Sequence, residues 1–207
     1  LGRTPLADGS AEEGARGRLT ASGIRAVELM ESLGILVDIS HLSLHGLRHV
    51  LEIATRPLVA SHSGAHALCG YHRNIPDAEL KTIAAGGGVI GVPAVGPMLV
   101  EQGRATVEHV LDHVEHVVSV AGIGHVGLGP DFFEEVGGVL YPGPPMPWSG
   151  IVDGLATPID LPGVWEALLN RGFSEADAAA VMGGNFIRVF RQGLGVPPAA
   201  APIPATS

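Results

Sequence analysis

Two histidines stand at equivalent places, each directly after a short apolar run of the sequence. His41 closes the letters Asp-Ile-Ser-His after one run, and His62 is the centre of Ser-His-Ser after the next. If the runs are neighbouring parallel strands, their ends lie about 5 Å apart, close enough for two imidazoles to bind one metal ion. The alternative is that each histidine hydrogen-bonds a loop carbonyl. The equivalent placement favours chemistry, and we predict that His41 and His62 are metal ligands.

Two more polar residues follow strand-like runs. Arg73 lies in a polar loop, where its guanidinium could bind a substrate carboxylate, although solvation explains a loop arginine equally well. Asp131 comes directly after Val126-Gly127-Leu128-Gly129-Pro130, and a carboxylate near a metal can hold water or transfer a proton. Loop aspartates also cap helices and turns. For Arg73, substrate binding and solvation both stay open at this point, and we predict that Asp131 is catalytic.

Other chemistry-bearing residues have simpler explanations. His109, His113 and His116 form an i, i+4, i+7 stripe among acidic neighbours, opposite a valine stripe. This pattern predicts a solvated helix face rather than a physiological metal site. Cys69 has no evident partner arrangement, so we expect a small buried residue rather than a nucleophile.

Short strands alternate with helical segments along the chain. The strand candidates, rich in β-branched residues, are Ile35–Ile39, Leu58–Ser61, Val89–Val92 and Val126–Gly129. Helices are expected from Thr20 or Ser22 to Gly34, after Ser43, after Pro76, over 107–121, and from Ser174 to about Gly193. Apolar strands that alternate with helices are typical of a parallel sheet covered by helices, so the expected fold class is α/β. Ligands bind such sheets at the carboxyl ends of the strands.

The composition excludes several classes of protein. The 207 residues carry a net charge of -9, 16% charged residues and a mean hydropathy of +0.32, which argue for a buried core and against nucleic-acid binding. The uncharged stretch 82–100 is interrupted by glycines and prolines, so it predicts no membrane span. One cysteine permits no internal disulfide, and we expect a cytoplasmic protein.

In order, these motifs resemble the membrane (renal) dipeptidase family of amidohydrolase-like metallopeptidases. The matching segments, spread over roughly residues 1 to 192, are Leu19–Gly23, Asp38–His41, Ser61–Ser63, Cys69 with Arg73-Asn74, Gly127–Phe132 and Gly184–Phe190. The resemblance implies a TIM-type (βα)8 barrel and a two-zinc centre in which His41 and His62 bind one zinc. It also implies that Arg73 and Asp131 contact a dipeptide substrate. Members cleave dipeptides, often accept a D residue on the C-terminal side, and are often dimeric.

The sequence departs from the family pattern in two ways. Phe133 stands where a second acidic residue is usual, and Glu134 and Glu135 follow it. The family's His-x-Asp pair, bridging glutamate and substrate-contacting histidine precede the region matched here. We therefore expect the C-terminal half of the barrel, about four βα units with an open sheet. The expected division is an active-site-side loop over 1–19, the half barrel over 20–192 and a flexible tail over 193–207.

Three functions are compatible with this sequence. The first is zinc-dependent dipeptide hydrolysis by a chain that lacks the N-terminal metal ligands, completed by an N-terminal half or a homodimer. The second is an inactive remnant or interaction module of the same fold. The third is another amidohydrolase, such as a cyclic amidase or a deaminase, although Arg73-Asn74 after His62 favours the dipeptidase.

Overall fold

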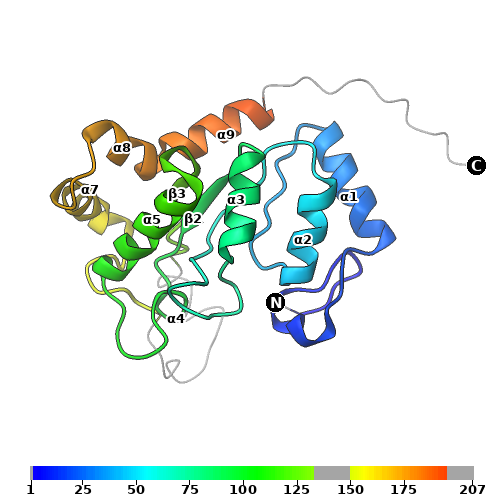
Figure 1. Cartoon of the computed structure of the whole chain (residues 1–207), viewed down its shortest axis with the longest axis horizontal. Coiled ribbons are helices and arrows are strands. Elements are labelled where there is room, and N and C mark those ends of the chain that lie inside the picture. The colour runs from blue at the N-terminus through cyan, green and yellow to red at the C-terminus, as the bar shows by residue number, and fades with distance from the viewer. Residues whose placement is uncertain (1, 133–149, 195–207) are drawn as a thin grey trace, which may run out of the picture.

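A three-stranded parallel sheet lies at the centre of the protein. The fold is seen in a computed structural model that describes residues 2–132 and 150–194 (Figure 1). The strands are β1 (Val59–Ala60), β2 (Val89–Val92) and β3 (Val126–Leu128), in the order β1-β2-β3. Val59 pairs with Val89, and Ile90 pairs with Val126. The predicted α/β class with parallel strands is confirmed, and the sheet is open over the described residues.

The predicted strand Ile35–Ile39 is not a strand in the structure. Its only pairing is a single parallel bridge between Asp38 and Val59, supported by the Ile39 N–H to Val59 carbonyl bond of 2.8 Å. The ladder goes no further because the Asp38 side chain accepts the next N–H, that of Ser61, at 3.1 Å. The segment therefore extends the sheet edge beside β1 by one bridge and then turns away.

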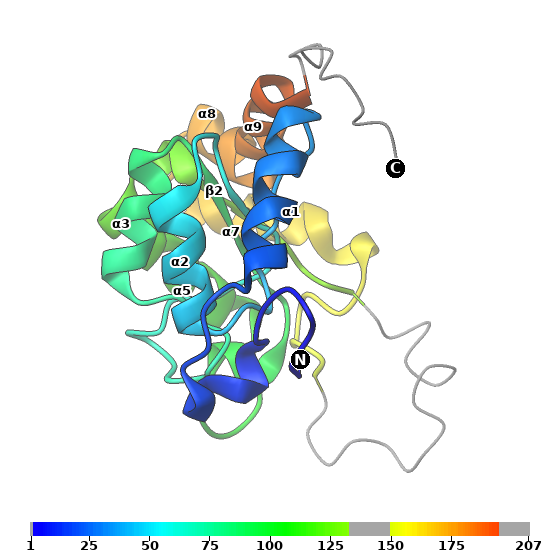
Figure 2. The same ribbon diagram turned by 90° about the vertical axis from the view of Figure 1, so that its right-hand side faces the viewer.

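Helices cover this sheet on both faces, as the two views in Figures 1 and 2 show. The described α-helices are α1 (Ala21–Ser32), α2 (Leu44–Ile53), α3 (Asp77–Ala85), α4 (Gly96–Leu99), α5 (Val107–Ala121), α7 (Leu161–Asn170), α8 (Glu175–Ala179) and α9 (Asn185–Leu194). Short helical turns are η1 (Ser10–Ala15), η2 (Ile123–His125), η3 (Pro158–Asp160) and η4 (Ala180–Gly184). Thr20 and Ser43 cap α1 and α2 through their side chains, as predicted.

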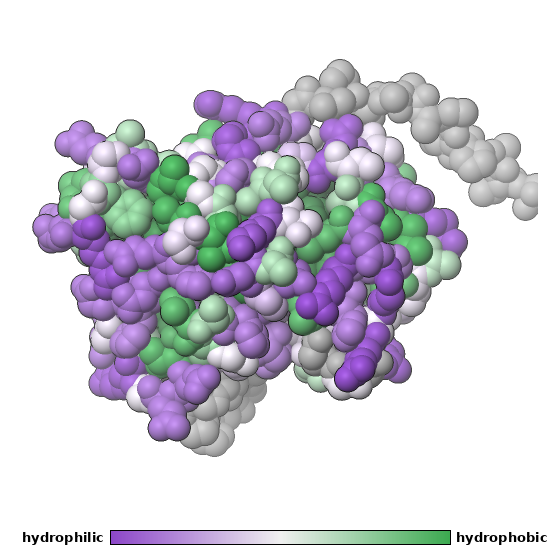
Figure 3. Space-filling view, in the orientation of Figure 1, coloured by the Kyte–Doolittle hydropathy of each residue, from purple (hydrophilic) through white to green (hydrophobic). Residues whose placement is uncertain are grey.

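The main core forms where α3 and α5 pack on one sheet face. Ile90 and Val92 of β2 are fully buried there with Leu80, Val110 and Val114. Because side chains alternate along a strand, Val89 and Gly91 face the other side. The outer surfaces of the covering helices carry hydrophilic residues with smaller apolar areas between them (Figure 3).

The opposite sheet face is covered by α9. The Phe186 ring packs directly against Gly91 and Gly127. A Cβ atom added to Gly91 would lie 2.9 Å from a ring carbon of Phe186, and one added to Gly127 would lie 2.6 Å from another. Asn185 Nδ2 donates to the Ile123 and Val126 carbonyls at 2.7 Å each, which fixes α9 to the start of β3. The motif that begins at Gly184 therefore has a structural role.

The C-terminal helix differs from its prediction. One helix was expected from Ser174 to about Gly193, but α8 is followed by the π-type turn η4, which contains the non-helical Gly183, and then by α9. The wider turn shifts the register of α9 so that Asn185 reaches the carbonyls at the start of β3. The described part of the expected tail is Gly193 and Leu194, and residues 195–207 lie outside the described residues.

The first residues of the chain lie beside the strand ends. Ser10 N–H donates to the His41 carbonyl at 2.8 Å, and Ser43 N–H donates to the Asp8 carbonyl at 3.0 Å. This segment therefore packs against the turn that carries His41. None of the helices in the described ranges has the length and apolar character needed to cross a membrane.

Candidate metal centre

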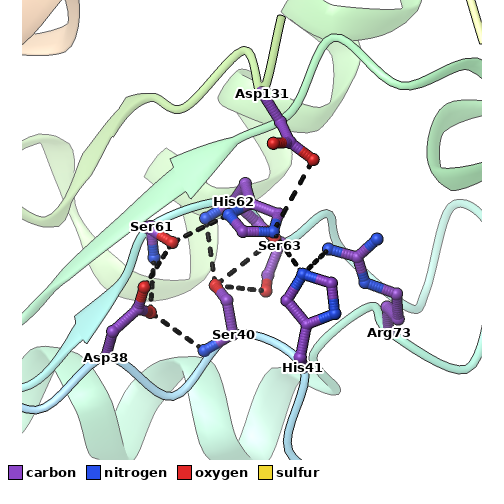
Figure 4. A network of polar contacts seen from close by, with 8 residues as sticks. All are labelled: Asp38, Ser40, His41, Ser61, His62, Ser63, Arg73 and Asp131. Atoms are coloured by element: carbon purple, nitrogen blue, oxygen red, sulfur yellow. Dashed lines mark hydrogen bonds and ion pairs between the residues drawn. The ribbon is translucent and has the colours of Figure 1, made fainter. Parts of the chain in front are cut away.

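The four residues predicted to do chemistry lie together at the carboxyl ends of the strands (Figure 4). His62 follows β1, Asp131 follows β3, His41 follows the bridged segment, and Arg73 comes from the loop before α3. The two imidazole Nε2 atoms are 2.8 Å apart, and Arg73 Nη2 lies 2.9 Å from His41 Nε2. Asp131 Oδ2 lies 3.7 Å from His62 Nε2. The structure thus brings all four side chains to one point.

Two of these residues have strained backbone conformations. His41 has φ of 72° and Asp131 has φ of 57°, in the left-handed region that L-residues seldom adopt. Within the described ranges, Arg16 is the only other non-glycine residue with a positive φ. Such conformations cost about 1–3 kcal/mol each and concentrate at functional sites. Here they turn both side chains toward the common point, His41 after the bridged segment and Asp131 after β3.

A network of polar groups contacts His62 on the side of the ring away from His41. Ser61 Oγ lies 2.6 Å from Asp38 Oδ2 and 2.8 Å from His62 Nδ1. Asp38 Oδ1 also accepts the N–H groups of Ser40 and Ser61, at 3.0 Å and 3.1 Å. The Ser40 hydroxyl accepts the His62 N–H at 3.0 Å. Asp38, Ser40 and Ser61 were not predicted as site residues, although they lie in the same two motifs as the histidines.

Both imidazoles are held in the neutral form. Burial lowers the pKa of His41 to about 4, with further lowering by Arg73 and His62 that Asp131 partly opposes. Burial also lowers the pKa of His62, with Asp131 opposing and Arg73 assisting. Neutral imidazole is the form that binds metal ions. At neutral pH the two rings are therefore available as ligands.

The donor set fits part of a zinc centre. Arginine nitrogens only donate, so the contact with Arg73 requires a lone pair on His41 Nε2. Two imidazole nitrogens bound to one tetrahedral zinc at about 2.0–2.1 Å are about 3.3 Å apart, close to the 2.8 Å seen here. No group of three or more His, Cys, Asp or Glu side chains in the described ranges could hold a metal ion. A catalytic zinc site usually has three protein ligands, so His41 and His62 fit it incompletely.

The prediction that His113 lies on a solvated face of the long helix α5 is wrong. His113 is 1% exposed, accepts the Ala65 N–H at Nδ1 (2.9 Å) and contacts the Leu99 carbonyl through Nε2 (3.1 Å). A neutral imidazole carries one donor and one acceptor, and both are satisfied by backbone groups outside α5, at Ala65 and at the end of α4. His109 completes a capping box at the start of α5, and His116 lies 2.8 Å from Asp77.

His113 and Asn74 together hold the loop that carries Arg73. Asn74 Oδ1 accepts the Gly64 N–H at 2.9 Å, while Asn74 Nδ2 donates to the Cys69 and Met98 carbonyls at 3.0 Å and 2.7 Å. Cys69 is 2% exposed, and burial raises the pKa of its thiol, in line with the predicted buried residue. Phe133, Glu134 and Glu135, where the sequence departs from the family pattern, lie outside the described residues.

Comparison with known proteins finds one family. The family model for membrane dipeptidase (peptidase family M19) matches residues 2–196. Dipeptidase tcpJ of Claviceps purpurea is 36% identical over 176 residues, which cover 84% of this chain and 38% of tcpJ. The chain thus spans about two fifths of that relative's length.

Solved structures agree with this match. An amidohydrolase from Pseudomonas aeruginosa superposes with a TM-score of 0.84 at 29% identity, covering 94% of this chain and 62% of that one. A metallopeptidase from Rhodobacter sphaeroides, liganded with a phosphinate mimic of the dipeptide L-Ala-D-Ala, superposes with a TM-score of 0.75 at 29% identity. That superposition covers 85% of this chain and 47% of the Rhodobacter chain.

Proposed function

We propose, from the premise that this chain belongs to the membrane dipeptidase family, that it supplies part of a zinc centre for dipeptide hydrolysis. The observation that carries the proposal is the convergence of His41 and His62, whose Nε2 atoms lie 2.8 Å apart beside Arg73 and Asp131. Both imidazoles are neutral because burial lowers their pKa values. This is the arrangement that two neighbouring zinc ligands need.

Each residue would have a distinct role. His41 and His62 would hold zinc, which when bound supplies a polarised peptide carbonyl and a water of lowered pKa. Arg73 would bind the dipeptide carboxylate, and its Nε is a buried donor without a partner in the described part of the chain. Asp131, with a side chain 39% exposed, would accept and return a proton.

The proposal includes the position of this chain in a larger barrel. The chain spans 38% of tcpJ and 62% of the Pseudomonas amidohydrolase, and its sheet is open in the part that the structure describes. We infer that it is the C-terminal half of a TIM-type (βα)8 barrel, about four βα units. The bridged segment at Asp38 would be the first of its four strands. An N-terminal half would supply the remaining zinc ligands, so that the complete centre holds two zinc ions.

A second candidate function is an inactive remnant or interaction module of the same fold. It is favoured by the ligand count, since the described residues provide no group of three metal-binding side chains. Likeness to the Pseudomonas amidohydrolase at 29% identity also keeps another amidohydrolase reaction open, such as a cyclic amidase or deaminase reaction.

The test compares metal content and turnover in a protein extended N-terminally through the absent motifs. His62→Ala should remove zinc, measured by mass spectrometry, and nearly all hydrolysis of Gly-D-Ala, because it deletes a ligand. His66→Ala is the matched control, since His66 is exposed in the same loop. Zinc and turnover that survive His62→Ala would contradict the metal centre. Bound zinc without dipeptide turnover in the unmutated protein would favour one of the other two functions.

A further inference from the structure

The polar network behind His62 fixes where its protons lie. Ser61 has a single hydroxyl proton, and its 2.6 Å contact with Asp38 Oδ2 is the length of a charge-assisted O–H to carboxylate bond. An ionised carboxylate can only accept, so Ser61 donates to Asp38. The 2.8 Å contact between Ser61 Oγ and His62 Nδ1 is then a hydrogen bond when His62 donates from Nδ1. A neutral ring has one N–H, so in this order the other 2.8 Å contact, between His62 Nε2 and His41 Nε2, holds no proton and suits a cation between the two nitrogens.

This proton order decides which His62 nitrogen faces His41. A neutral imidazole protonated at Nδ1 carries its lone pair at Nε2. His41 Nε2 also carries a lone pair, because Arg73 donates to it at 2.9 Å. The two lone pairs meet at 2.8 Å, with the Asp131 carboxylate 3.7 Å from His62 Nε2. The network thus prepares an electron-rich point that a cation would fill.

We propose that Asp38 is a positioning residue that, through Ser61, holds His62 in the Nδ1–H tautomer and so sets the zinc affinity of the centre. The inference rests on the proposed function, since it takes His62 as a zinc ligand. Partners on the outer nitrogen of a ligand histidine orient the ring, and their mutation typically costs about 10- to 100-fold in metal affinity. Asp38 lies on the exposed side of its segment, so three hydrogen bonds rather than burial hold it in place.

Asp38→Asn should reverse the network. The amide oxygen can still accept the N–H groups of Ser40 and Ser61, while the amide nitrogen takes the place of Oδ2 and donates to Ser61 Oγ. The Ser61 hydroxyl is then free to donate to His62 Nδ1. His62 changes to the Nε2–H tautomer, and its lone pair no longer faces His41.

The experiment is long-range proton–nitrogen NMR of the metal-free 207-residue chain at neutral pH. Signals of His62 are assigned by their absence from the His62→Gln spectrum. We expect the Nδ1–H tautomer in the unmutated chain and the Nε2–H tautomer in Asp38→Asn. Titration with zinc chloride should then show zinc affinity about 10- to 100-fold lower in Asp38→Asn. An unchanged His62 tautomer, or an unchanged zinc affinity, would overturn the inference.

Asp160→Asn is the matched control, because Asp160 also accepts two backbone N–H groups and one hydroxyl, from Ala156 and Thr157. It loses the same charge without contacting a histidine, so tautomer and zinc affinity should stay as they are. Ser61→Ala is the second variant if Asp38→Asn does not fold. Without the hydroxyl, both His62 tautomers should be populated, and adding Ser61→Ala to Asp38→Asn should abolish the reversal. Retention of the Nδ1–H tautomer alone in Ser61→Ala would also overturn the inference.

Failure of the proposed function has a different signature. If zinc shifts neither the His41 nor the His62 signals in the N-terminally extended protein, these residues are not zinc ligands, and the proposed function is wrong. The tautomer comparison needs no metal, so it still tests the link from Asp38 to His62. If zinc shifts the signals of both His41 and His62 while Asp38→Asn leaves the His62 tautomer and the zinc affinity unchanged, the proposed function is supported. The positioning role of Asp38 is then wrong.

Discussion

At the scale of single residues, the backbone conformation that directs the Asp131 carboxylate into the site lowers the stability of the fold. Its φ of 57° is unfavourable for an L-residue by about 1–2 kcal/mol. Glycine adopts this conformation freely but loses more freedom on folding, by about 0.5–1 kcal/mol. In the described part of the chain, the ion pair of this carboxylate is a 3.7 Å contact with His62, so little binding energy from described residues offsets the strain.

We therefore expect Asp131→Gly to be more stable than Asp131→Ala by about 1 kcal/mol, measured by urea unfolding of the 207-residue chain. Both variants lose the carboxylate, so their difference isolates the backbone conformation. In a complete enzyme, both should lose the proton transfer assigned to Asp131. Equal unfolding free energies for the two variants would mean that Asp131 is not strained.

Among the elements, α9 and the sheet depend on close contact at glycine. A Cβ at Gly127 would lie 2.6 Å from the Phe186 ring, closer than real atoms approach. Gly127→Ala should therefore lower the free energy of unfolding by about 1–3 kcal/mol through overpacking. Gly124→Ala is the control, because nothing lies within 4 Å of its Cβ position, and it should be neutral or slightly stabilising. Phe186→Leu should recover part of the loss in the Gly127→Ala chain and not in the Gly124→Ala chain.

His113 connects α5 to the loop of Arg73, and the stability that it contributes should fall at acidic pH. Burial lowers the pKa of His113, although its bond to the Leu99 carbonyl opposes this. Because the unfolded chain takes up the proton first, the stability due to neutral His113 is full above about pH 6.5 and is lost as the pH falls below it. His113→Gln keeps a donor and an acceptor without titrating.

Urea unfolding at several pH values should show a shallower loss of stability for His113→Gln. The slope should fall by at most about 1.4 kcal/mol per pH unit. His41 and His62 have lowered pKa values too and keep contributing in the same direction. The control for replacing a histidine with glutamine is His66→Gln, at an exposed position. A slope unchanged by His113→Gln would show that His113 is not held neutral.

Sequence patterns predicted the elements better than the contacts between them. The apolar runs before His62 and Asp131 correctly predicted the ends of two strands. Parallel strands that are buried on both faces consist of consecutive apolar residues, which are easy to recognise in a sequence. The run before His41 gave only one bridge, since a side chain, Asp38, took the next N–H. The prediction for His113 was wrong because its acidic neighbours indicate the character of only one side of α5, whereas its partners, Ala65 and Leu99, belong to other parts of the fold. The role of Asp38 needed the same kind of tertiary contact.

At the scale of the whole molecule, an incomplete centre should bind zinc weakly. Two imidazoles are fewer than the three protein ligands of a typical catalytic zinc, and the sheet that carries them is open over the described residues. A ligand that binds only the folded state stabilises it by about 2.7 kcal/mol at 100 times its Kd. Weak binding to the 207-residue chain should therefore leave its unfolding curve nearly unchanged at micromolar zinc.

An N-terminally extended protein should respond differently, because the absent ligands would complete the coordination of zinc. Micromolar zinc should raise its free energy of unfolding by about 2–3 kcal/mol, and His62→Ala should abolish that gain while His66→Ala keeps it. The exposed apolar side chains of this chain also fit an added N-terminal half, since its strands and helices could cover them. They lie in α1, in α9 and in the segment between α1 and the bridge at Asp38: Leu29, Leu33, Ile35, Ile187 and Phe190. Robust zinc stabilisation and Gly-D-Ala turnover by the 207-residue chain alone would contradict the ligand count. The site would then be completed within these 207 residues, with Glu134 outside the described ranges as the first residue to substitute.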